Sequence, residues 1–348
     1  MSEVVLSPLA MPVIGGLARY APPPVSGLNL ADNTNLWGTP PAAVREIAAA
    51  AAGAASYPSL YGEALKAAAA ESLGMSPEAI VTGCGSDNVL DAAMRAFAGA
   101  GRRVAFCAPT FVMVPKFATL AGATPVPLAF RPDGDIDADA LLAADADITY
   151  VCAPNNPTGV QPSDAAVARV LERARGLVII DEAYTEYSGR TWAAEAVAHG
   201  RLLVCRTMSK AYGMAGLRAG FGVARADVIA ALERARGPYT LNALAERAAA
   251  AAVREDGAWI AEHARQAVAT RERLAEGLRA LGYAPLPSGA NFLCVPVDGA
   301  GIIAARLRER GLLVRAFTAL PGLGDALRIT VGPWTIMQQL LDALAEDR

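Results

Sequence analysis

Histidine is scarce in this chain, and neither sign of charge dominates. The 348 residues contain two histidines, His199 and His263, which lie too far apart in sequence to form a metal-ligand pattern. The formal net charge is -3, so the composition gives no reason to expect nucleic acid or a membrane surface as a partner. No apolar run approaches the length of a membrane-spanning helix, and no internal repeat is visible. These deficits argue against metal chemistry, nucleic-acid binding and membrane insertion.

Cysteine is also sparse, and its spacing shows no pairs. The five cysteines mostly sit in or beside apolar runs, as buried, reduced thiols do: Cys84, Cys107, Cys152, Cys205 and Cys294. A mildly apolar stretch near the N-terminus is interrupted by Pro8 and Pro12 and follows no basic residue, so we expect no signal peptide. We therefore expect a cytoplasmic protein.

The sequence does contain a regular alternation of strand-like and helical patterns. Between about residues 40 and 235, this alternation predicts an α/β fold with a mostly parallel sheet covered on both faces. A charged helical pattern at 259–281, strands near Asn291 and Leu312, and a helix after Pro333 predict a smaller α+β domain. We divide the chain into an N-terminal arm (1–39), a large domain (40–240) and a small C-terminal domain (241–348).

Three of the predicted strands end in polar side chains. Their apolar runs are 148–152, 177–180 and 202–205. The first leads into a turn that contains Asn156, and the second ends in Asp181, with Tyr184 three residues later. The third precedes Ser209 and Lys210. Because α/β sheets bind ligands at the carboxyl ends of their strands, these side chains are predicted to share one site.

Lys210 and Asp181 have chemical reasons to lie at such a site. A lysine that is partly desolvated beside other cations loses proton affinity, and its amine can then form a Schiff base with a carbonyl. An ionised aspartate in an apolar sheet is costly unless it meets a cation, and a protonated pyridine nitrogen is such a cation. For Lys210 alone, a solvated surface lysine is the ordinary interpretation. The neighbouring strand end that carries Asp181 favours the catalytic one.

Together these motifs carry a resemblance to a known family. The order and spacing of the Asn-Pro-Thr-Gly turn at 156–159, the Asp181-x-x-Tyr184 strand end and the segment from Ser209 to Arg218 match fold type I pyridoxal-phosphate enzymes. Within the class I/II aminotransferases, the chain is most similar to the histidinol-phosphate aminotransferase family. The likeness runs from about Asn29 to the C-terminus. It implies a large cofactor domain with a mostly parallel sheet and a smaller C-terminal domain.

The resemblance also implies roles around the ring of pyridoxal 5'-phosphate. Lys210 would hold the cofactor as a Schiff base and then act as the base that moves a proton. Asp181 would keep the pyridine nitrogen protonated. Asn156 and Tyr184 would hydrogen-bond the phenolic oxygen. Phe111 takes the position of the aromatic ring that stacks on the pyridine face, although core packing is its alternative interpretation.

A phosphate cradle is expected where a glycine-rich turn precedes a helical pattern. Gly85, Ser86 and Asp87 would offer backbone amides at the helix N-terminus, and the alternative is an ordinary helix cap formed by Ser86 or Asp87. By resemblance, Ser209 and Arg218 complete the phosphate site.

The resemblance further implies a homodimer with shared active sites. Tyr57 is similar to a tyrosine that reaches across the dimer interface to the cofactor phosphate of the neighbouring subunit. The family usually has an arginine before this tyrosine, whereas this chain has Ser56. Tyr61 is therefore a rival for the same role.

On the substrate side, arginines are expected to bind anions. Arg328 matches the arginine that binds the substrate carboxylate, for which a planar, bidentate donor is suited. Arg315 matches an arginine used for the distal phosphate of histidinol phosphate, but an exposed strand could give the same alternation. Asn33 can be aligned with the family's N-terminal segment. Trp37 adds a large ring near the expected pocket, which suits an aromatic amino acid or a tryptophan that simply packs the arm.

The resemblance implies an aminotransferase that moves an amino group from histidinol phosphate or a related donor, aromatic ones included, to a 2-oxo acid such as 2-oxoglutarate. The alternative is a decarboxylase or lyase similar to threonine-phosphate decarboxylase, because the cofactor residues would be the same. A non-enzymatic regulator is disfavoured because Lys210, Asp181 and Arg328 are all present.

Overall fold

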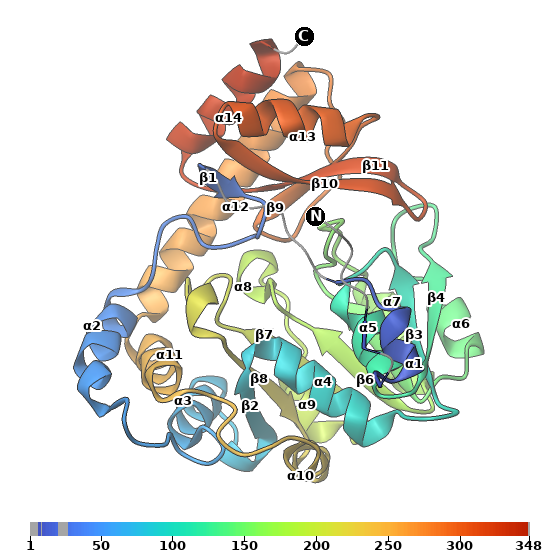
Figure 1. The fold of residues 1–348 in the computed structure, drawn as a ribbon, viewed down its shortest axis with the longest axis vertical. Coiled ribbons are helices and arrows are strands. Elements are labelled where there is room, and N and C mark those ends of the chain that lie inside the picture. The colour runs from blue at the N-terminus through green and yellow to red at the C-terminus, as the bar shows by residue number, and fades with distance from the viewer. Residues whose placement is uncertain (1–5, 8, 20–26, 347–348) are drawn as a thin grey trace.

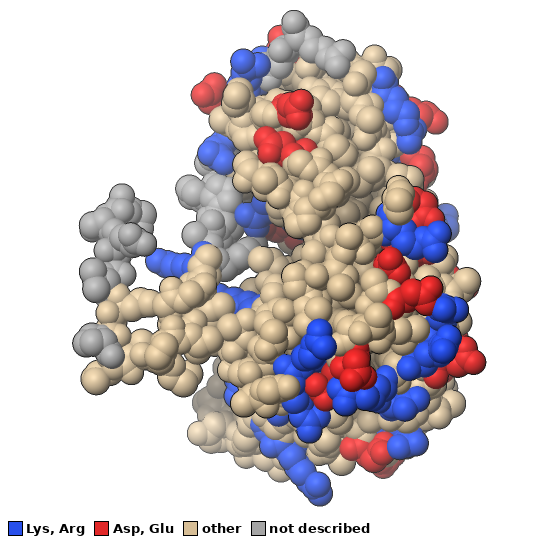
Figure 2. Space-filling model, turned by 90° about the vertical axis from the view of Figure 1, so that its right-hand side faces the viewer, with Lys and Arg blue, Asp and Glu red and all other residues tan. Residues whose placement is uncertain are grey.

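The computed structural model describes residues 6–7, 9–19 and 27–346 and shows two bodies joined by a long helix (Figure 1). The larger body surrounds a seven-stranded sheet and the smaller one a four-stranded sheet. On the face shown in Figure 2, acidic and basic side chains are interspersed over the larger body. No helix among the described residues is long and apolar enough to cross a membrane.

The seven-stranded sheet confirms the predicted α/β fold. Its strands, in spatial order, are β2 (Ile80–Cys84), β8 (Ala219–Ala224), β7 (Leu202–Thr207), β6 (Leu177–Asp181), β5 (Ile148–Cys152), β3 (Arg103–Ala108) and β4 (Thr124–Ala129). Strand β8 runs antiparallel to both of its neighbours, and the other pairs are parallel. The three predicted strand ends therefore lie side by side, because β5, β6 and β7 are consecutive in the sheet.

Helices cover both faces of this sheet because its central strands are apolar on both sides. In β6, Ile179 packs into one core, whereas Val178 and Ile180 pack into the other, as the two-residue period of a strand requires. The first core includes residues of α4 (Gly85–Phe97), α5 (Met113–Leu120) and α10 (Ala226–Ala235). The second includes residues of α2 (Pro41–Ala50), α3 (Glu63–Leu73), α6 (Ala138–Ala143), α7 (Asp164–Arg173), α9 (Ala193–Ala198) and α11 (Ala243–Glu255).

The smaller body is an α+β unit that recruits part of the N-terminal arm. Its strands follow the order β1 (Leu28–Leu30), β10 (Leu312–Leu320), β11 (Gly324–Thr330) and β9 (Phe292–Pro296). Strand β1 pairs with β10 in parallel, and the other pairs are antiparallel. Residues of α12 (Gly257–Ala280), α13 (Ala300–Glu309) and α14 (Trp334–Glu346) share one core with this sheet. The remaining short elements are α1 (Pro12–Gly15), α8 (Thr185–Ser188) and the 3-10 turns Ala51–Gly53, Pro77–Ala79 and Ala215–Leu217.

Helix α11 lies beyond the expected domain boundary at residue 240 but packs with the larger body. Its buried alanines, among them Ala245, Ala248 and Ala252, share a core with Ala43 of α2 and Leu65 of α3. Small side chains let these helices approach closely, so the turn between α10 and α11 is a loop within the larger body. Of the expected arm 1–39, residues 1–5, 8 and 20–26 lie outside the described part.

Candidate active site

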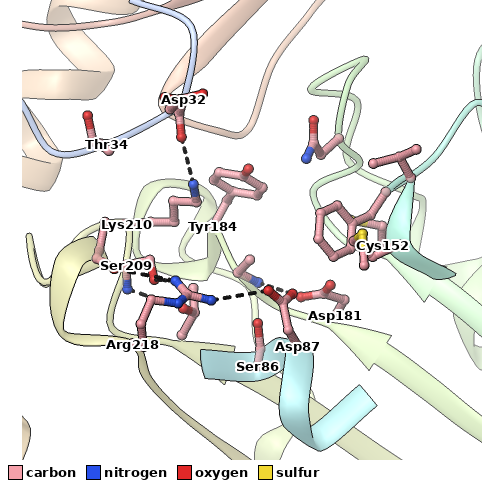
Figure 3. A pocket seen from close by; sticks show the side chains of 17 residues that line it. Asp32, Thr34, Ser86, Asp87, Cys152, Asp181, Tyr184, Ser209, Lys210 and Arg218 are labelled. Atoms are coloured by element: carbon pink, nitrogen blue, oxygen red, sulfur yellow. Dashed lines mark hydrogen bonds and ion pairs between the residues drawn. The ribbon is translucent and has the colours of Figure 1, made fainter. Parts of the chain in front are cut away.

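The three strand ends open into a cavity of about 550 Å³ (Figure 3). The expected cofactor residues that line it are Ser86, Asp87, Phe111, Asn156, Asp181, Tyr184, Ser209, Lys210 and Arg218. They come from the carboxyl ends of β5, β6 and β7, from the start of α4, and from the loops next to them. The fold therefore brings together side chains that are far apart in the sequence, as expected for the edge of a parallel sheet.

Lys210 extends into this cavity, where its amine has a lowered proton affinity. Its Nζ donates to the backbone oxygen of Asp32 at 2.9 Å and lies 5.8 Å from the centre of the Tyr184 ring. Burial, followed by the positive charge of Arg328, lowers the pKa of Lys210 to about 8. About a tenth of this lysine would therefore be an uncharged nucleophile at pH 7, far more than for an ordinary lysine.

Asp181 closes β6 as a buried carboxyl group. It accepts hydrogen bonds from the Tyr150 hydroxyl at 2.8 Å and from the backbone amide of Ala183 at 3.1 Å. Burial raises the pKa of Asp181 to about 6. A cationic partner within the cavity would favour its charged form. The sequence interpretation missed Tyr150, whose hydroxyl in an otherwise apolar strand next to β6 was the available signal.

Tyr184 is held by a hydrogen-bond network from the N-terminal arm and the smaller body. Asn33 Nδ2 donates to the Tyr184 hydroxyl at 3.0 Å. The backbone amide of Asn33 donates to Thr330 Oγ1, also at 3.0 Å. Asn291 Nδ2 donates to the backbone oxygen of Asn33 at 3.1 Å. Because Asn33 donates to it, the Tyr184 hydroxyl keeps its own proton for a further acceptor. Burial raises the pKa of Tyr184, which keeps that proton in place. The sequence interpretation also assigned no role to Thr330, which supports Asn33.

The start of α4 has the geometry that an anion cradle requires. The helix begins at Gly85, so Ser86 and Asp87 lie inside its first turn, and neither is the cap that the alternative interpretation assumed. Gly85 has a φ of +74°, and a Cβ there would lie 2.7 Å from Arg218 Nη2. Glycine thus lets the backbone amides of the helix start and the guanidinium face the same space.

Arg218 completes the cradle through side-chain contacts. Its Nη1 donates to Ser209 Oγ at 3.4 Å, and its Nη2 donates to Asp87 Oδ2 at 3.1 Å. Burial raises the pKa of Asp87, and the positive charge of Arg218 opposes this rise. The arrangement concentrates donors at one end of the cavity, where a phosphate would be bound by amides, a hydroxyl and a guanidinium.

A second cavity of about 470 Å³ adjoins the first and shares Asp32, Phe111, Val112, Asn156, Tyr184 and Lys210 with it. Its distinctive residues are two arginines on neighbouring strands, since Arg315 of β10 lies directly opposite Arg328 of β11. Both strands belong to the smaller body.

The two arginines are held in place by the arm and by the Asn156 turn. Arg328 is 7% exposed, and its Nη1 donates to Asn156 Oδ1 at 2.6 Å. Its Nη2 donates to the backbone oxygen of Ala31. Arg315 Nη2 lies 3.9 Å from Asp32 Oδ1, and its side chain is 16% exposed, which does not fit the exposed-strand alternative. Like charges placed side by side are unfavourable, so an anion between them would be stabilising.

Trp37 lines neither of these two cavities. Its ring lies 6.3 Å from that of His263 on α12 and packs between the two bodies. The substrate contact expected for Trp37 is therefore not seen. The position of Trp37 fits the alternative, a tryptophan that packs the arm. The Trp37 backbone amide donates to Asn35 Oδ1, and this bond closes the turn that leads the arm toward α12.

Tyr57 also lies outside both cavities. The residue is 83% exposed, and its ring stacks on that of Tyr239 with 4.9 Å between the centroids. The rival, Tyr61, places its ring 5.2 Å from the guanidinium of the buried Arg236. Within one chain, neither tyrosine reaches the anion cradle.

The donor set of the cavity fits pyridoxal phosphate. The cradle, with its uncapped helix start, Ser209 and Arg218, suits a phosphate. In the same cavity, the buried carboxyl group of Asp181 suits a protonated ring nitrogen, and Lys210 suits an aldehyde. The described residues contain no group of three His, Cys, Asp or Glu that could hold a metal ion.

Comparisons with known proteins agree with this chemistry. The family model for aminotransferase class I and II matches residues 25–344. A histidinol-phosphate aminotransferase of Thermoanaerobacter sp. (strain X514) is 34% identical over 295 residues, which cover 83% of this chain and 84% of the relative. An aromatic amino acid aminotransferase of Rhodococcus jostii (strain RHA1) is 38% identical over 313 residues, with 88% and 86% covered.

The fold also matches a solved structure over nearly its whole length. The histidinol-phosphate aminotransferase from Sinorhizobium meliloti, solved in complex with pyridoxal-5'-phosphate, superposes with a TM-score of 0.89 at 24% sequence identity. The match covers 98% of each chain.

Proposed function

Because the chain belongs to the class I and II aminotransferases and so depends on pyridoxal phosphate, we propose that it takes its amino group from an anionic donor with an unsaturated ring, such as histidinol phosphate, and passes it to a 2-oxo acid such as 2-oxoglutarate. The observation that carries this choice is the pair of arginines, Arg315 and Arg328, in a cavity that also contains Lys210. Two adjacent guanidinium groups suit a phosphate or a carboxylate.

Aromatic side chains support a donor that carries a ring. Phe106, Phe111 and Phe317 line the same cavity as the two arginines. Aromatic rings attract other flat rings through offset or edge-to-face contacts, so an imidazole or a phenyl group suits this wall. An aromatic amino acid is therefore the second candidate donor, and the relative from Rhodococcus jostii favours it.

In the proposed mechanism, the residues of the chain bind the donor and move one proton. Pyridoxal phosphate, when bound, would supply a carbonyl for the amino group and a ring that withdraws electrons from the donor Cα. Arg328 and Arg315 would orient the donor by its anionic end, while Asp181 would keep the ring nitrogen protonated. Lys210 Nζ would take the proton from the donor Cα and pass it to the carbon that carried the cofactor's carbonyl. Tyr184 would donate a hydrogen bond to the phenolic oxygen, with Asn33 holding its hydroxyl in place.

We also propose a homodimer in which Tyr57 serves the neighbouring active site. The ring of Tyr61 contacts Arg236, whereas Tyr57 is 83% exposed, so Tyr57 is the better placed of the two to reach another subunit. A cytoplasmic location is proposed as well, since all five cysteines are free thiols, as is usual in reducing compartments.

Steady-state kinetics with a panel of donors tests the proposed substrate. We expect kcat/KM with histidinol phosphate to exceed that with phenylalanine, tyrosine and threonine phosphate, with 2-oxoglutarate as the acceptor. Preference for phenylalanine or tyrosine would establish the second candidate. Release of carbon dioxide from threonine phosphate, without amino transfer, would instead support the lyase alternative.

A further inference from the structure

The exposed ring of Tyr57 stacks on the ring of Tyr239, a residue with an unusual backbone conformation. The ring centroids of Tyr57 and Tyr239 lie 4.9 Å apart with 29° between the ring planes, although the two residues are 83% and 42% exposed. Exposed rings normally sample several rotamers, and stacking restricts them. The contact therefore limits the directions in which Tyr57 can point.

Tyr239 adopts a backbone conformation that a bulky residue rarely occupies. Its φ is +59°, in the left-handed region. Such a conformation is retained where the surrounding structure imposes it, and it is frequent at functional sites. Here the strained backbone supports a residue that is still 42% exposed, so burial offsets the strain only in part.

Hydrogen bonds fasten the Tyr239 loop to the Tyr57 loop. The Tyr239 amide donates to the backbone oxygen of Leu60 at 3.0 Å. Next to it, the Thr240 hydroxyl accepts from Arg236 Nη1 at 2.6 Å, and the guanidinium of Arg236 lies beneath the ring of Tyr61. The two loops thus form one supported unit whose outermost ring is that of Tyr57.

We infer that Tyr239 is a positioning residue, whose ring orients Tyr57 toward the cofactor phosphate of a second copy of the chain. The inference rests on the proposed homodimer with shared active sites. An oriented tyrosine loses less conformational freedom when it makes its contact, so the stack strengthens that contact without touching the phosphate itself.

The test compares ring removal with ring retention at position 239. In Tyr239→Asn the ring is lost, but asparagine tolerates the left-handed backbone, so the loop keeps its conformation. Tyr239→Phe keeps the ring and is the matched control, and circular dichroism with thermal unfolding verifies that both variants fold. The dissociation constant of pyridoxal phosphate is measured on the full chain by absorbance titration, and the oligomeric state by sedimentation velocity.

We expect Tyr239→Asn to weaken cofactor binding about 3- to 10-fold, the range for loss of one aromatic stack, while the dimer persists and Tyr239→Phe binds as the wild type does. Tyr57→Phe, which lacks the hydroxyl, should also weaken binding. In the double variant Tyr57→Phe/Tyr239→Asn, the second change should add nothing, because Tyr239 acts through that hydroxyl.

The outcomes distinguish a failure of the positioning role of Tyr239 from a failure of the proposed shared active site. If Tyr57→Phe weakens cofactor binding but Tyr239→Asn does not, or if the two losses add, the positioning role of Tyr239 is overturned and the shared site stands. A monomeric wild type with a full complement of cofactor, or unchanged binding in Tyr57→Phe, overturns the shared site and the inference with it.

Discussion

The cofactor side of the active site is built on one sheet edge, whereas the substrate side is assembled from three separate parts of the chain. Asp181 and Lys210 follow neighbouring strands of the same sheet, and the anion cradle adjoins them. By contrast, Arg328 belongs to the smaller body, Asn156 to the larger one and Ala31 to the arm, and hydrogen bonds connect them. A rigid sheet edge thus holds the reactive groups, while donor recognition depends on how the two bodies and the arm meet.

This difference predicts that the two sides can be disabled separately. Changes on the sheet edge should affect cofactor chemistry with every donor. Changes on the substrate side should leave the cofactor bound and alter the preference among donors.

The largest expected effect is that of Lys210→Ala. Removal of the amine should lower turnover by at least about 10⁴-fold with all donors, because it removes both the covalent anchor and the base. Steady-state kinetics and the visible spectrum of the bound cofactor measure the loss. Lys116→Ala, which changes a lysine that lies outside both cavities, is the control and should behave as the wild type does. Full activity in Lys210→Ala would refute the proposed mechanism.

Arg328→Ala should disable the substrate side alone. Loss of this buried guanidinium should reduce kcat/KM about 30- to 1,000-fold, as expected when one member of a buried charge pair is truncated. The affinity for pyridoxal phosphate should fall much less than kcat/KM, because Arg328 contacts the cofactor side through Asn156 and does not line the cavity that holds the anion cradle. A parallel loss of cofactor affinity would show that the two sides are not separable.

Arg315→Gln sharpens the comparison by distinguishing donors. We expect about a 10- to 100-fold loss of kcat/KM with histidinol phosphate, because a charged hydrogen bond to phosphate is lost, and a smaller loss with phenylalanine. Kinetics with both donors measures the ratio. Equal losses with the two donors would mean that Arg315 does not discriminate a phosphate.

The lowered pKa of Lys210 predicts how cofactor uptake depends on pH. Only the uncharged amine reacts with an aldehyde, and its pKa is about 8 instead of the usual 10.5. The rate at which the cofactor-free chain reacts with pyridoxal phosphate should therefore rise about tenfold per pH unit below the pKa and level off above it. Stopped-flow absorbance gives the midpoint. A midpoint near the ordinary lysine value would contradict the desolvated environment of Nζ.

Trp37→Phe should have the smallest effect. Because Trp37 lines neither cavity, we expect donor preference to change less than about twofold, with a small loss of thermal stability from the reduced packing. Competition between histidinol phosphate and phenylalanine measures the preference. A clear shift of the preference toward one donor would show that Trp37 does contribute to donor recognition.

The same contrast explains what the sequence could predict. Asp181 and Lys210 each follow an apolar strand, so local pattern and the rule for parallel sheets suffice to bring them together. The role of Tyr150 was not predicted, because its contact with Asp181 depends on the pairing of β5 with β6, and the pattern of a single strand does not reveal that pairing.

The substrate side was harder to predict because it depends on tertiary packing. The direction of the Trp37 ring depends on how the arm turns at Asn35. Thr330 can accept its hydrogen bond from Asn33 only because β11 lies beside the arm. Helix α11 shows the same limit at the level of domains. Its alanines indicate close helix packing, but the sequence does not indicate which body they pack against.

The most direct test of the central claim is a single turnover of the holoenzyme with histidinol phosphate in the absence of a 2-oxo acid. Absorbance follows the cofactor while the products are quantified. The account predicts conversion of the cofactor to its amine form, one equivalent of the oxo product per site and no carbon dioxide. Carbon dioxide release, or no change in the cofactor with this donor or with aromatic amino acids, would contradict it.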